Sequence, residues 1–351
     1  MIELMRGDII KQDAEALVNT VNCVGVMGRG IALQFRKAFP DNYKAYRAAC
    51  KRKEVQPGRM FVSDLNRMIN PRLIINFPTK RHWKGKSRLE DIHDGLKDLV
   101  AVLEHYEVQS VAIPPLGCGL GGLDWDEVRP LIKEALSALP NLQVYLFEPE
   151  GTPSAEWMVN HTATPNMTAG RAALLGLMSR YLAGLMDVSV SLLEIHKLMY
   201  LLQETGEPLK LRYTKATYGP YAENLRHVLD AIEGHFITGY GAGEDVPDKQ
   251  IELKEDAAER SKNYLSDYPD TLEKFGRVSE LIAGFETPFG MELLTTVHWV
   301  ADQEGAGNAD EAIERTYEWN DRKRMFTPEQ IHIAWDVLAE HGWLNADSCS
   351  A

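Results

Sequence analysis

The first 150 residues alternate short apolar runs with amphipathic segments, and this alternation limits the fold more than any other feature of the chain. The runs AEALVNTVN, RLIINFP, SVAIPPLG and LQVYLFEP are bounded by proline, glycine or asparagine, as buried strands are. Helical patterns separate them at residues 30–39, 41–53, 87–106 and 123–139. The third of these opens with Ser87 and has Glu90 three residues later, which predicts a capping box. Strands separated by helices predict an α/β fold, a three-layer α/β/α sandwich around a mostly parallel or mixed sheet.

The rest of the chain has a different pattern. A chain of 351 residues exceeds the usual single core, so two domains are expected. We expect residues 1–150 to form the α/β domain and residues 151–168, rich in proline, serine and threonine, to form a linker. Residues 169–351 show apolar positions three and four apart in most segments, which predicts a mainly α-helical second domain. HFITGY and KQIELK there are candidates for a small strand pair.

Composition excludes several classes of protein. No apolar window of about 18 residues occurs, and the N-terminus MIELMRGD is charged where a signal peptide is apolar, so we expect a cytoplasmic protein without a membrane partner. The four cysteines are far apart and form no CxxC pair, which predicts reduced thiols and no structural metal site.

The formal charge of −13 is unevenly distributed. Residues 1–90 contain 18 Lys and Arg against 8 Asp and Glu, whereas residues 151–351 contain 17 against 32, a net charge of −15. This asymmetry suggests that each half meets a different kind of partner. An acidic surface that serves only solubility is the alternative.

Two loops that leave predicted strands are rich in glycine. NTVNCVGVMGRG and PPLGCGLGG each lead into a predicted helix. Glycine permits close approach of backbone amides to a ligand, and a helix N-terminus favours anions, so two such loops on one sheet edge suit a diphosphate. Neither loop matches GxxxxGK[ST], and GVMGRG fits GxGxxG poorly, which argues against nucleotide-hydrolase and dehydrogenase folds. Tight turns that need glycine for conformation alone are the alternative.

A third loop, FPTKRHWKGKSR, follows the strand RLIINF and is strongly basic. Cationic side chains interleaved with an aromatic ring suit single-stranded nucleic acid, because they supply charge for phosphates and a stacking face for a base. The predicted nucleic-acid contacts are Arg81, His82, Trp83 and Lys84. A solvated basic loop is the alternative, but it gives Trp83 little reason to be exposed.

These motifs resemble the macrodomain family of ADP-ribose-binding modules. The resemblance covers residues 1–150 and rests on GDI at 7–9, on NTVN followed by a glycine-rich helix entry, and on PPLGCGLGG. It implies that Asp8 binds the adenine amine, that Ile9 lines the adenine pocket, and that the second glycine loop holds the diphosphate. The implied ADP-ribose contacts are Asp8, Ile9, Asn19, Gly28, Gly30, Ile31, Thr79, Gly117, Cys118, Gly119, Leu120 and Gly121.

Finer features point to one subgroup. The lysine in FPTK resembles the branch that includes the terminal ADP-ribose glycohydrolase and the DarG antitoxins, which implies catalytic roles for Lys80 and Asn22. Gly121 stands where the protein-ester hydrolases of that branch carry aspartate, and this favours ADP-ribosylated single-stranded DNA as the substrate. In the second half, HKLMYLLQ and TYGPY resemble the helical C-terminal domain of DarG antitoxins and of the superfamily typified by SocA. This implies a cognate DarT-type ADP-ribosyltransferase toxin as a partner, bound by an acidic surface that imitates DNA.

The expected activity is therefore hydrolysis of the bond between the distal ribose of ADP-ribose and a DNA base, most plausibly thymine, without a cofactor or metal. Lys80 would either give a proton to the departing base or attack the opened sugar as a nucleophile, and the sequence does not choose between these roles. A non-catalytic ADP-ribose reader fused to an interaction domain is the alternative. His196 and Tyr200 in the second half are expected to be core residues.

Overall fold

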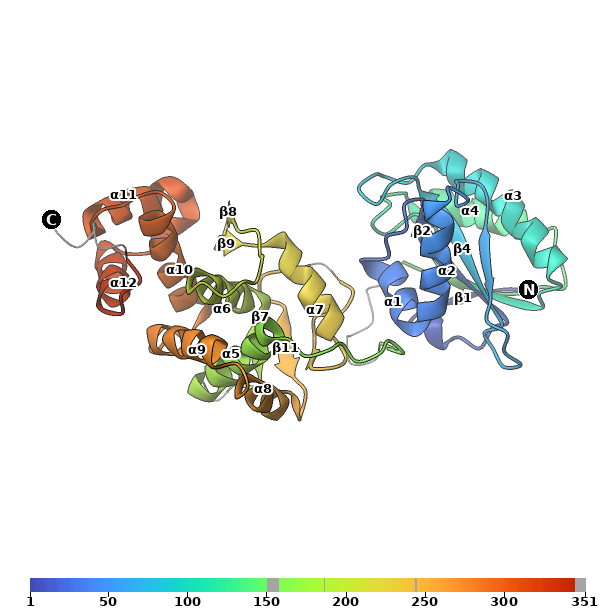
Figure 1. Cartoon of the computed structure of the whole chain (residues 1–351). Coiled ribbons are helices and arrows are strands. Elements are labelled where there is room, and N and C mark those ends of the chain that lie inside the picture. Colours follow the sequence, from blue (N-terminus) through green and yellow to red (C-terminus); the bar gives the residue numbers. More distant parts are fainter. Residues whose placement is uncertain (150–157, 186, 244, 345–351) are drawn as a thin grey trace. The chain divides into compact units, whose positions relative to one another are not determined.

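The computed structural model describes residues 1–149, 158–185, 187–243 and 245–344. It divides into two compact units (Figure 1), Met1–Ala163 with Ala242–Glu244, and Thr164–Gly241 with Asp245–Ala351. Of the linker expected at 151–168, residues 151–157 lie outside the described residues.

The first unit is built on a mixed six-stranded sheet of order β1-β6-β5-β2-β4-β3. Its strands are β1 (Ile2–Met5), β2 (Ala16–Asn22), β3 (Phe61–Asp64), β4 (Leu73–Lys80), β5 (Ser110–Ile113) and β6 (Gln143–Phe147). All neighbours pair in parallel except β3, which runs antiparallel to β4 at the edge. The predicted sheet is thus confirmed. Besides the four runs expected as strands, the sheet contains β1 and the edge strand β3, each of four residues.

Helices cover both faces of this sheet, as the side chains of β2 demonstrate. Ala16 and Val18 share a core with α3 (Leu89–His105) and α4 (Trp125–Leu136), whereas Leu17 packs with α1 (Gly30–Ala38) on the opposite face. Val21 packs on the same side as Leu17, with α2 (Pro40–Lys51). Successive strand residues point to opposite faces, so a strand buried on both sides carries consecutive apolar residues, as Ala16–Val18 of β2 do. The predicted three-layer α/β/α fold is confirmed.

The start of α2 agrees with its local sequence signal, whereas the start of α3 does not. Pro40 occupies the first turn of α2, where its fixed φ and missing N–H cost nothing. The capping box expected at Ser87 is wrong, because α3 begins at Leu89 with Arg88 as its N-cap and without a side-chain cap hydrogen bond. Ser87 instead donates its backbone amide to the carbonyl oxygen of Gly121, 3.0 Å away. Ser87 thus makes a tertiary contact with Gly121 and does not cap α3, as the local pattern had suggested.

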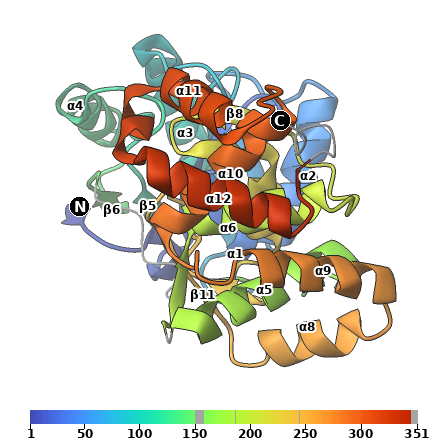
Figure 2. The same cartoon turned by 90° about the vertical axis from the view of Figure 1, so that its left-hand side faces the viewer.

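The second unit is mainly helical, as predicted. Its helices are α5 (Ala169–Leu185), α6 (Leu192–Glu204), η3 (Glu223–Leu225), α7 (Arg226–Ile232), α8 (Ala257–Leu265), α9 (Pro269–Leu281), α10 (Pro288–Asp302), α11 (Ala309–Trp319), η4 (Asp321–Met325) and α12 (Pro328–Glu340). Helix α5 packs on α8 and α9, and α10 packs on α6, α11 and α12 (Figure 2). The expected core positions are confirmed, since His196 is 4% exposed and Tyr200 is fully buried.

Two small sheets complete this unit. The expected strand pair is confirmed as β10 (Ile237–Thr238) against β11 (Gln250–Leu253), and β7 (Ser189–Ser191) adds a third strand. A hairpin of β8 (Thr214–Ala216) and β9 (Gly219–Tyr221) carries the GPY sequence. Strands of two to four residues are too short to leave a clear period in the sequence, which is why β7, β8 and β9 were not anticipated.

Candidate active site

Four sequence motifs meet at one edge of the sheet. Strands β1, β2, β4 and β5 belong to the parallel part of the sheet, so their carboxyl ends lie at the same edge. The segments that leave this edge are 6–8, 23–29, 81–88 and 114–124. They hold Asp8, both glycine-rich loops and the basic loop. In α/β sheets, ligands bind beyond the carboxyl ends of the strands, so the candidate site lies at this edge.

Asn22, the last residue of β2, holds the first glycine loop in shape. Its side-chain Nδ2 donates to the carbonyl oxygen of Val26 at 2.5 Å, and its Oδ1 accepts from the amides of Val24 at 3.0 Å and Val26 at 3.3 Å. The hydroxyl of Tyr46 on α2 donates to the carbonyl oxygen of Asn22 at 2.5 Å. Asn22 therefore acts as a positioning residue for the loop. Tyr46 was missed, because nothing in DNYKAYRAACKRK distinguishes it from an ordinary core tyrosine.

Lys80, the last residue of β4, joins the other two loops. It is opposite Asn22 in the strand register, and its Nζ donates a hydrogen bond to the carbonyl oxygen of Leu120 in the second glycine loop. Partial burial lowers the pKa of its amine below the usual lysine value. Gly30, at the start of α1, also approaches Leu120, since a Cβ on Gly30 would lie 3.7 Å from the Leu120 side chain. The three loops therefore converge around Lys80 and Leu120.

The second glycine loop presents bare backbone. Gly117 and Gly122 have φ angles of +74° and +76°, a region that other residues rarely adopt. Between them, the amides of Gly119, Leu120 and Gly121 donate no hydrogen bond to any residue that the structure describes. Three successive amide donors without a partner form a concavity of the kind that binds anions. This arrangement agrees with the diphosphate role expected of the loop.

Gly121 has no room for a side chain. A Cβ there would lie 2.2 Å from the carbonyl oxygen of Gly117 and 2.3 Å from the Oγ of Ser87. The fold around Gly121 therefore excludes a side chain at this position. Ser87 is 7% exposed, and its Oγ makes no hydrogen bond to the described residues. Its role in closing the loop had no sequence signal, since the local pattern marked it as a helix cap.

The adenine-binding candidates are partly engaged in local structure. Asp8 caps the short helix η1 (Ile9–Lys11), and its Oδ1 accepts from the amide of Ile10 at 2.9 Å. Its other carboxylate oxygen lies 3.9 Å from the Nζ of Lys11. The Ile9 side chain is 3% exposed and packs in the core beneath α1. Asp8 thus remains at the site edge, whereas Ile9 contributes mainly to the core under it.

Asn19 and Thr79 lie inside the fold. The Asn19 side chain is fully buried and donates to the Oδ1 of Asn76 on β4 at 2.9 Å, while Asn76 donates to Asn42 on α2 at 2.7 Å. Thr79 is 4% exposed and its hydroxyl lies 3.5 Å from the carbonyl oxygen of Val21. Asn19 thus ties the sheet to α2 through Asn76, and Thr79 joins β4 to β2. We assign Asn19 a structural role in place of the ligand contact expected from the sequence.

The basic loop is exposed as expected, but one of its cations, Arg81, is already paired with a carboxylate of the protein. The guanidinium of Arg81 forms a bidentate ion pair with the buried carboxylate of Asp91 on α3, at 2.9 and 3.2 Å. Trp83 is 42% exposed, stacks on His82 with 5.6 Å between ring centroids, and has the Nζ of Lys84 4.9 Å from its ring. The loop therefore presents a stacking surface flanked by positive charge, while Arg81 anchors it.

The cysteines at this edge are not nucleophiles. Burial raises the pKa of Cys118 to about 11 and that of Cys23 to about 11, so both are thiols near neutral pH. The thiol of Cys118 donates to the carbonyl oxygen of Leu116 at 3.5 Å. Within the described residues, no group of three or more His, Cys, Asp or Glu side chains is placed to hold a metal ion. In the same part of the chain, every helix is too short or too polar to cross a membrane.

Comparison with known proteins gives one family for the whole chain. Residues 18–132 match the Macro domain family. A DNA ADP-ribosyl glycohydrolase of Thermus aquaticus is 46% identical over 347 residues, which are 99% of this chain and 95% of that protein. A DNA ADP-ribosyl transferase-DNA ADP-ribosyl glycohydrolase fusion protein of Thermosipho africanus is 37% identical over 164 residues, 41% of this chain and 42% of that one. The solved macrodomain of Thermus aquaticus DarG is 54% identical, covering 42% of this chain and 99% of that one with a TM-score of 0.42.

Proposed function

The chain belongs to the family of DNA ADP-ribosyl glycohydrolases, and on this premise we propose that it removes ADP-ribose from DNA bases. The observation that supports this most directly is the convergence of Lys80, Leu120 and the first glycine loop at the carboxyl edge of the sheet. A lysine with a lowered pKa beside an anion-binding loop is a suitable group for catalysis on a phosphate-bearing ligand. The macrodomain, residues 1–150, carries this activity.

ADP-ribose is bound along the same edge. The unpartnered amides of Gly119, Leu120 and Gly121 hold the diphosphate, with the N-terminus of α1 on the other side. Asp8 receives the adenine amine, and the loop that Asn22 shapes, including Gly28, Gly30 and Ile31, encloses the distal ribose. Because these contacts are remote from the bond that breaks, their binding energy orients the distal ribose against Lys80.

The reaction breaks the bond between C1 of the distal ribose and a base nitrogen. Positive charge develops on the sugar ring and negative charge on the departing base. In one route Lys80 gives a proton to the base nitrogen while water adds to C1. In the other, neutral Lys80 attacks C1 of the opened sugar, the base leaves with a proton, and water later hydrolyses the imine. Neither route needs a cofactor.

The substrate is ADP-ribosylated single-stranded DNA, with thymine as the favoured base. Trp83 supplies the stacking face, and His82 and Lys84 beside it supply the polar and cationic surroundings. Steric exclusion of an acid at Gly121 supports DNA over protein esters. Arg81 contributes by fixing the loop against α3, since its charge is paired with Asp91.

The acidic second half binds and inhibits a cognate DNA ADP-ribosyltransferase of the DarT type. Residues 151–351 carry a net charge of −15, which suits the cationic groove of an enzyme that modifies DNA. The fusion relative from Thermosipho africanus, which joins a transferase to a glycohydrolase in one chain, supports the pairing. We place both activities in the cytoplasm, where DNA is present and the free thiols of Cys23, Cys50 and Cys118 persist.

The deciding experiment offers the full chain single-stranded oligonucleotides ADP-ribosylated on thymine or on guanine. We expect release of ADP-ribose and recovery of the unmodified thymine oligonucleotide, resolved by gel mobility and mass. Binding of ADP-ribose without release from either oligonucleotide would establish the reader function in its place. Faster release from the guanine oligonucleotide would correct the base preference while leaving the reaction intact.

A further inference from the structure

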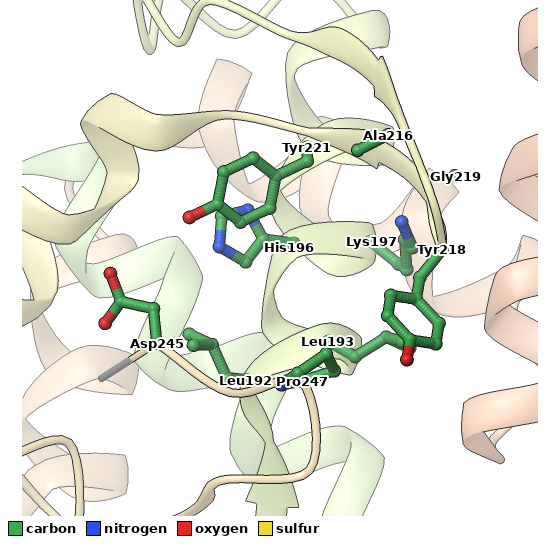
Figure 3. A pocket seen from close by; sticks show the side chains of 10 residues that line it. All are labelled: Leu192, Leu193, His196, Lys197, Ala216, Tyr218, Gly219, Tyr221, Asp245 and Pro247. Carbon is green, nitrogen blue, oxygen red and sulfur yellow. The ribbon is translucent and has the colours of Figure 1, made fainter. Parts of the chain in front are cut away.

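The two motifs of the second unit that the proposed function does not use meet at one cavity (Figure 3). His196 and Lys197 come from HKLMYLLQ on α6, and Tyr218, Gly219 and Tyr221 come from TYGPY on the β8–β9 hairpin. The cavity holds about 50 Å³ of free space and opens to solvent, and leucines at the start of α6 and Pro247 supply most of its remaining wall. Its surface is mainly carbon, so it favours an apolar occupant.

The hairpin is fixed against α6 by buried polar contacts. The Nζ of Lys197 donates to the carbonyl oxygen of Pro220 at 2.8 Å. Gly219 has a φ of +97°, and a Cβ there would lie 3.0 Å from that Nζ, so only glycine suits the position. Behind it, Lys323 and Glu292 form a buried ion pair at 2.7 Å. The cavity is therefore preformed, which reduces the entropy lost on binding.

His196 directs an unused donor into this cavity. Its ring is 4% exposed and stacks on Tyr221 with 4.3 Å between centroids. Burial lowers its pKa to about 3, so the imidazole is neutral, and its Nδ1 accepts the amide of Ala222 at 3.4 Å. The proton is then on Nε2, which has no hydrogen-bond partner among the described residues. An acceptor on a ligand seated in the cavity would therefore gain a hydrogen bond from this donor.

These features select one kind of side chain. An aromatic ring matches the apolar walls and stacks beside Tyr221. The Nε2–H of His196 requires an acceptor, which excludes phenylalanine, and tryptophan and arginine present only donors. A tyrosine supplies both the ring and an accepting hydroxyl oxygen. Aromatic side chains seated in such pockets are frequent anchors of protein interfaces.

Charge favours a protein over a nucleotide as the source of that ring. The region from 151 to 351 is strongly acidic, and the cavity wall includes Asp245, whose Oδ1 lies 3.9 Å from the Nζ of Lys249. A phosphate would be repelled there, whereas a cationic protein would be attracted. We propose that this cavity is an anchor site that receives a tyrosine side chain of a basic protein partner. The assignment of that partner as the ADP-ribosyltransferase rests on the proposed function.

A probe experiment tests the cavity without the partner. The full chain, labelled with ¹³C at histidine, is titrated with p-cresol, toluene, 3-methylindole and thymidine 5′-monophosphate. We expect p-cresol to shift the His196 signal and to bind at least ten-fold more tightly than toluene or 3-methylindole. His196→Phe, which keeps a ring but removes the donor, should abolish that preference. Equal binding of toluene and p-cresol, or tighter binding of the nucleotide, would overturn the proposal.

A second measurement links the cavity to the partner. Ala216→Trp fills the cavity, and Ala283→Trp, at an exposed position of the same unit, is the matched control. We expect Ala216→Trp to weaken binding of the ADP-ribosyltransferase at least ten-fold, with the control unchanged and both variants folded by circular dichroism. If the parent chain binds and Ala216→Trp binds equally, the anchor is wrong. If the parent chain does not bind, the toxin assignment fails and the p-cresol titration still decides the cavity.

Discussion

The amine of Lys80 at the end of β4 donates a hydrogen bond to the carbonyl oxygen of Leu120 in the loop after β5. One side chain thus bridges the strand end that bears the basic loop and the loop whose amides are arranged for a diphosphate. Binding of ADP-ribose between the loops would place the distal ribose beside this amine.

Replacement of Lys80 separates binding from chemistry. Lys80→Ala removes the amine but leaves the unpartnered amides of the second glycine loop in place, so ADP-ribose affinity should change by less than about three-fold. Turnover of the ADP-ribosylated oligonucleotide should fall by about 10²–10⁴-fold, the range for loss of a general acid or base. Calorimetry with ADP-ribose and a single-turnover assay measure the two effects. Unchanged turnover would remove Lys80 from the mechanism.

The pH dependence of turnover distinguishes the two roles of Lys80. Burial lowers its pKa below the ordinary value of 10.5, so its titration should be visible below that pH. A proton donor must be charged, so kcat would fall as the pH rises through the lowered pKa. A nucleophile must be neutral, so kcat would rise through the same range. A profile without a break in either direction would contradict both roles.

Gly121 and Gly119 form a matched pair for testing the glycine loop. A Cβ at 121 would meet the carbonyl of Gly117 and the Oγ of Ser87, whereas a Cβ at 119 meets nothing within 4 Å and that residue has no positive φ. Gly121→Ala should therefore weaken ADP-ribose binding at least ten-fold and destabilise the first unit by about 1–3 kcal/mol, as overpacking does. Gly119→Ala should fold normally. Equal stability of the two variants would show that the loop can shift to accommodate a Cβ at position 121 and would contradict the prediction.

The sequence predicted the layers and the site edge because those depend on local patterns. Short apolar runs such as Ala16–Val18 of β2 and glycine-rich segments after strands are visible in the sequence alone. Ser87 was misread and Tyr46 was missed because their roles come from contacts with residues far along the chain, Gly121 and Asn22. A serine three residues before a glutamate has the same local appearance whether or not a distant loop claims it. Only the folded structure shows whether such a serine caps a helix or contacts a distant loop.

Replacement of Trp83 should weaken binding of the DNA substrate and leave binding of free ADP-ribose unchanged. Its exposed ring lies on the basic loop, and base stacking is worth about 1–3 kcal/mol. Trp83→Ala should raise KM for the ADP-ribosylated oligonucleotide by about 5–150-fold. Trp83→Phe, which keeps a smaller stacking face, should lose less. By calorimetry, both variants should bind ADP-ribose with the affinity of the parent protein. A loss of ADP-ribose affinity would mean that Trp83 holds the loop in shape and does not contact the DNA strand.

His298 makes the second unit sensitive to acid. It is buried, its Nδ1 pairs with the hydroxyl of Tyr200 at 2.8 Å, and burial lowers its pKa to about 4 from 6.5. Below about pH 6.5 the unfolded chain takes up a proton at this residue that the folded chain does not, so stability falls as the pH drops from 6.5 towards 4.

The lowering of the His298 pKa from 6.5 to about 4 corresponds to roughly 3 kcal/mol of stability. His196, whose pKa is lowered to about 3, steepens the same loss of stability with falling pH. His298→Gln should lower the overall stability but flatten the decline in unfolding free energy between pH 6.5 and 4.5, measured by urea titration. His227→Gln, at an exposed position on α7, should leave the slope unchanged. Because the Gln variant cannot titrate, an undiminished slope would assign the acid sensitivity to other groups.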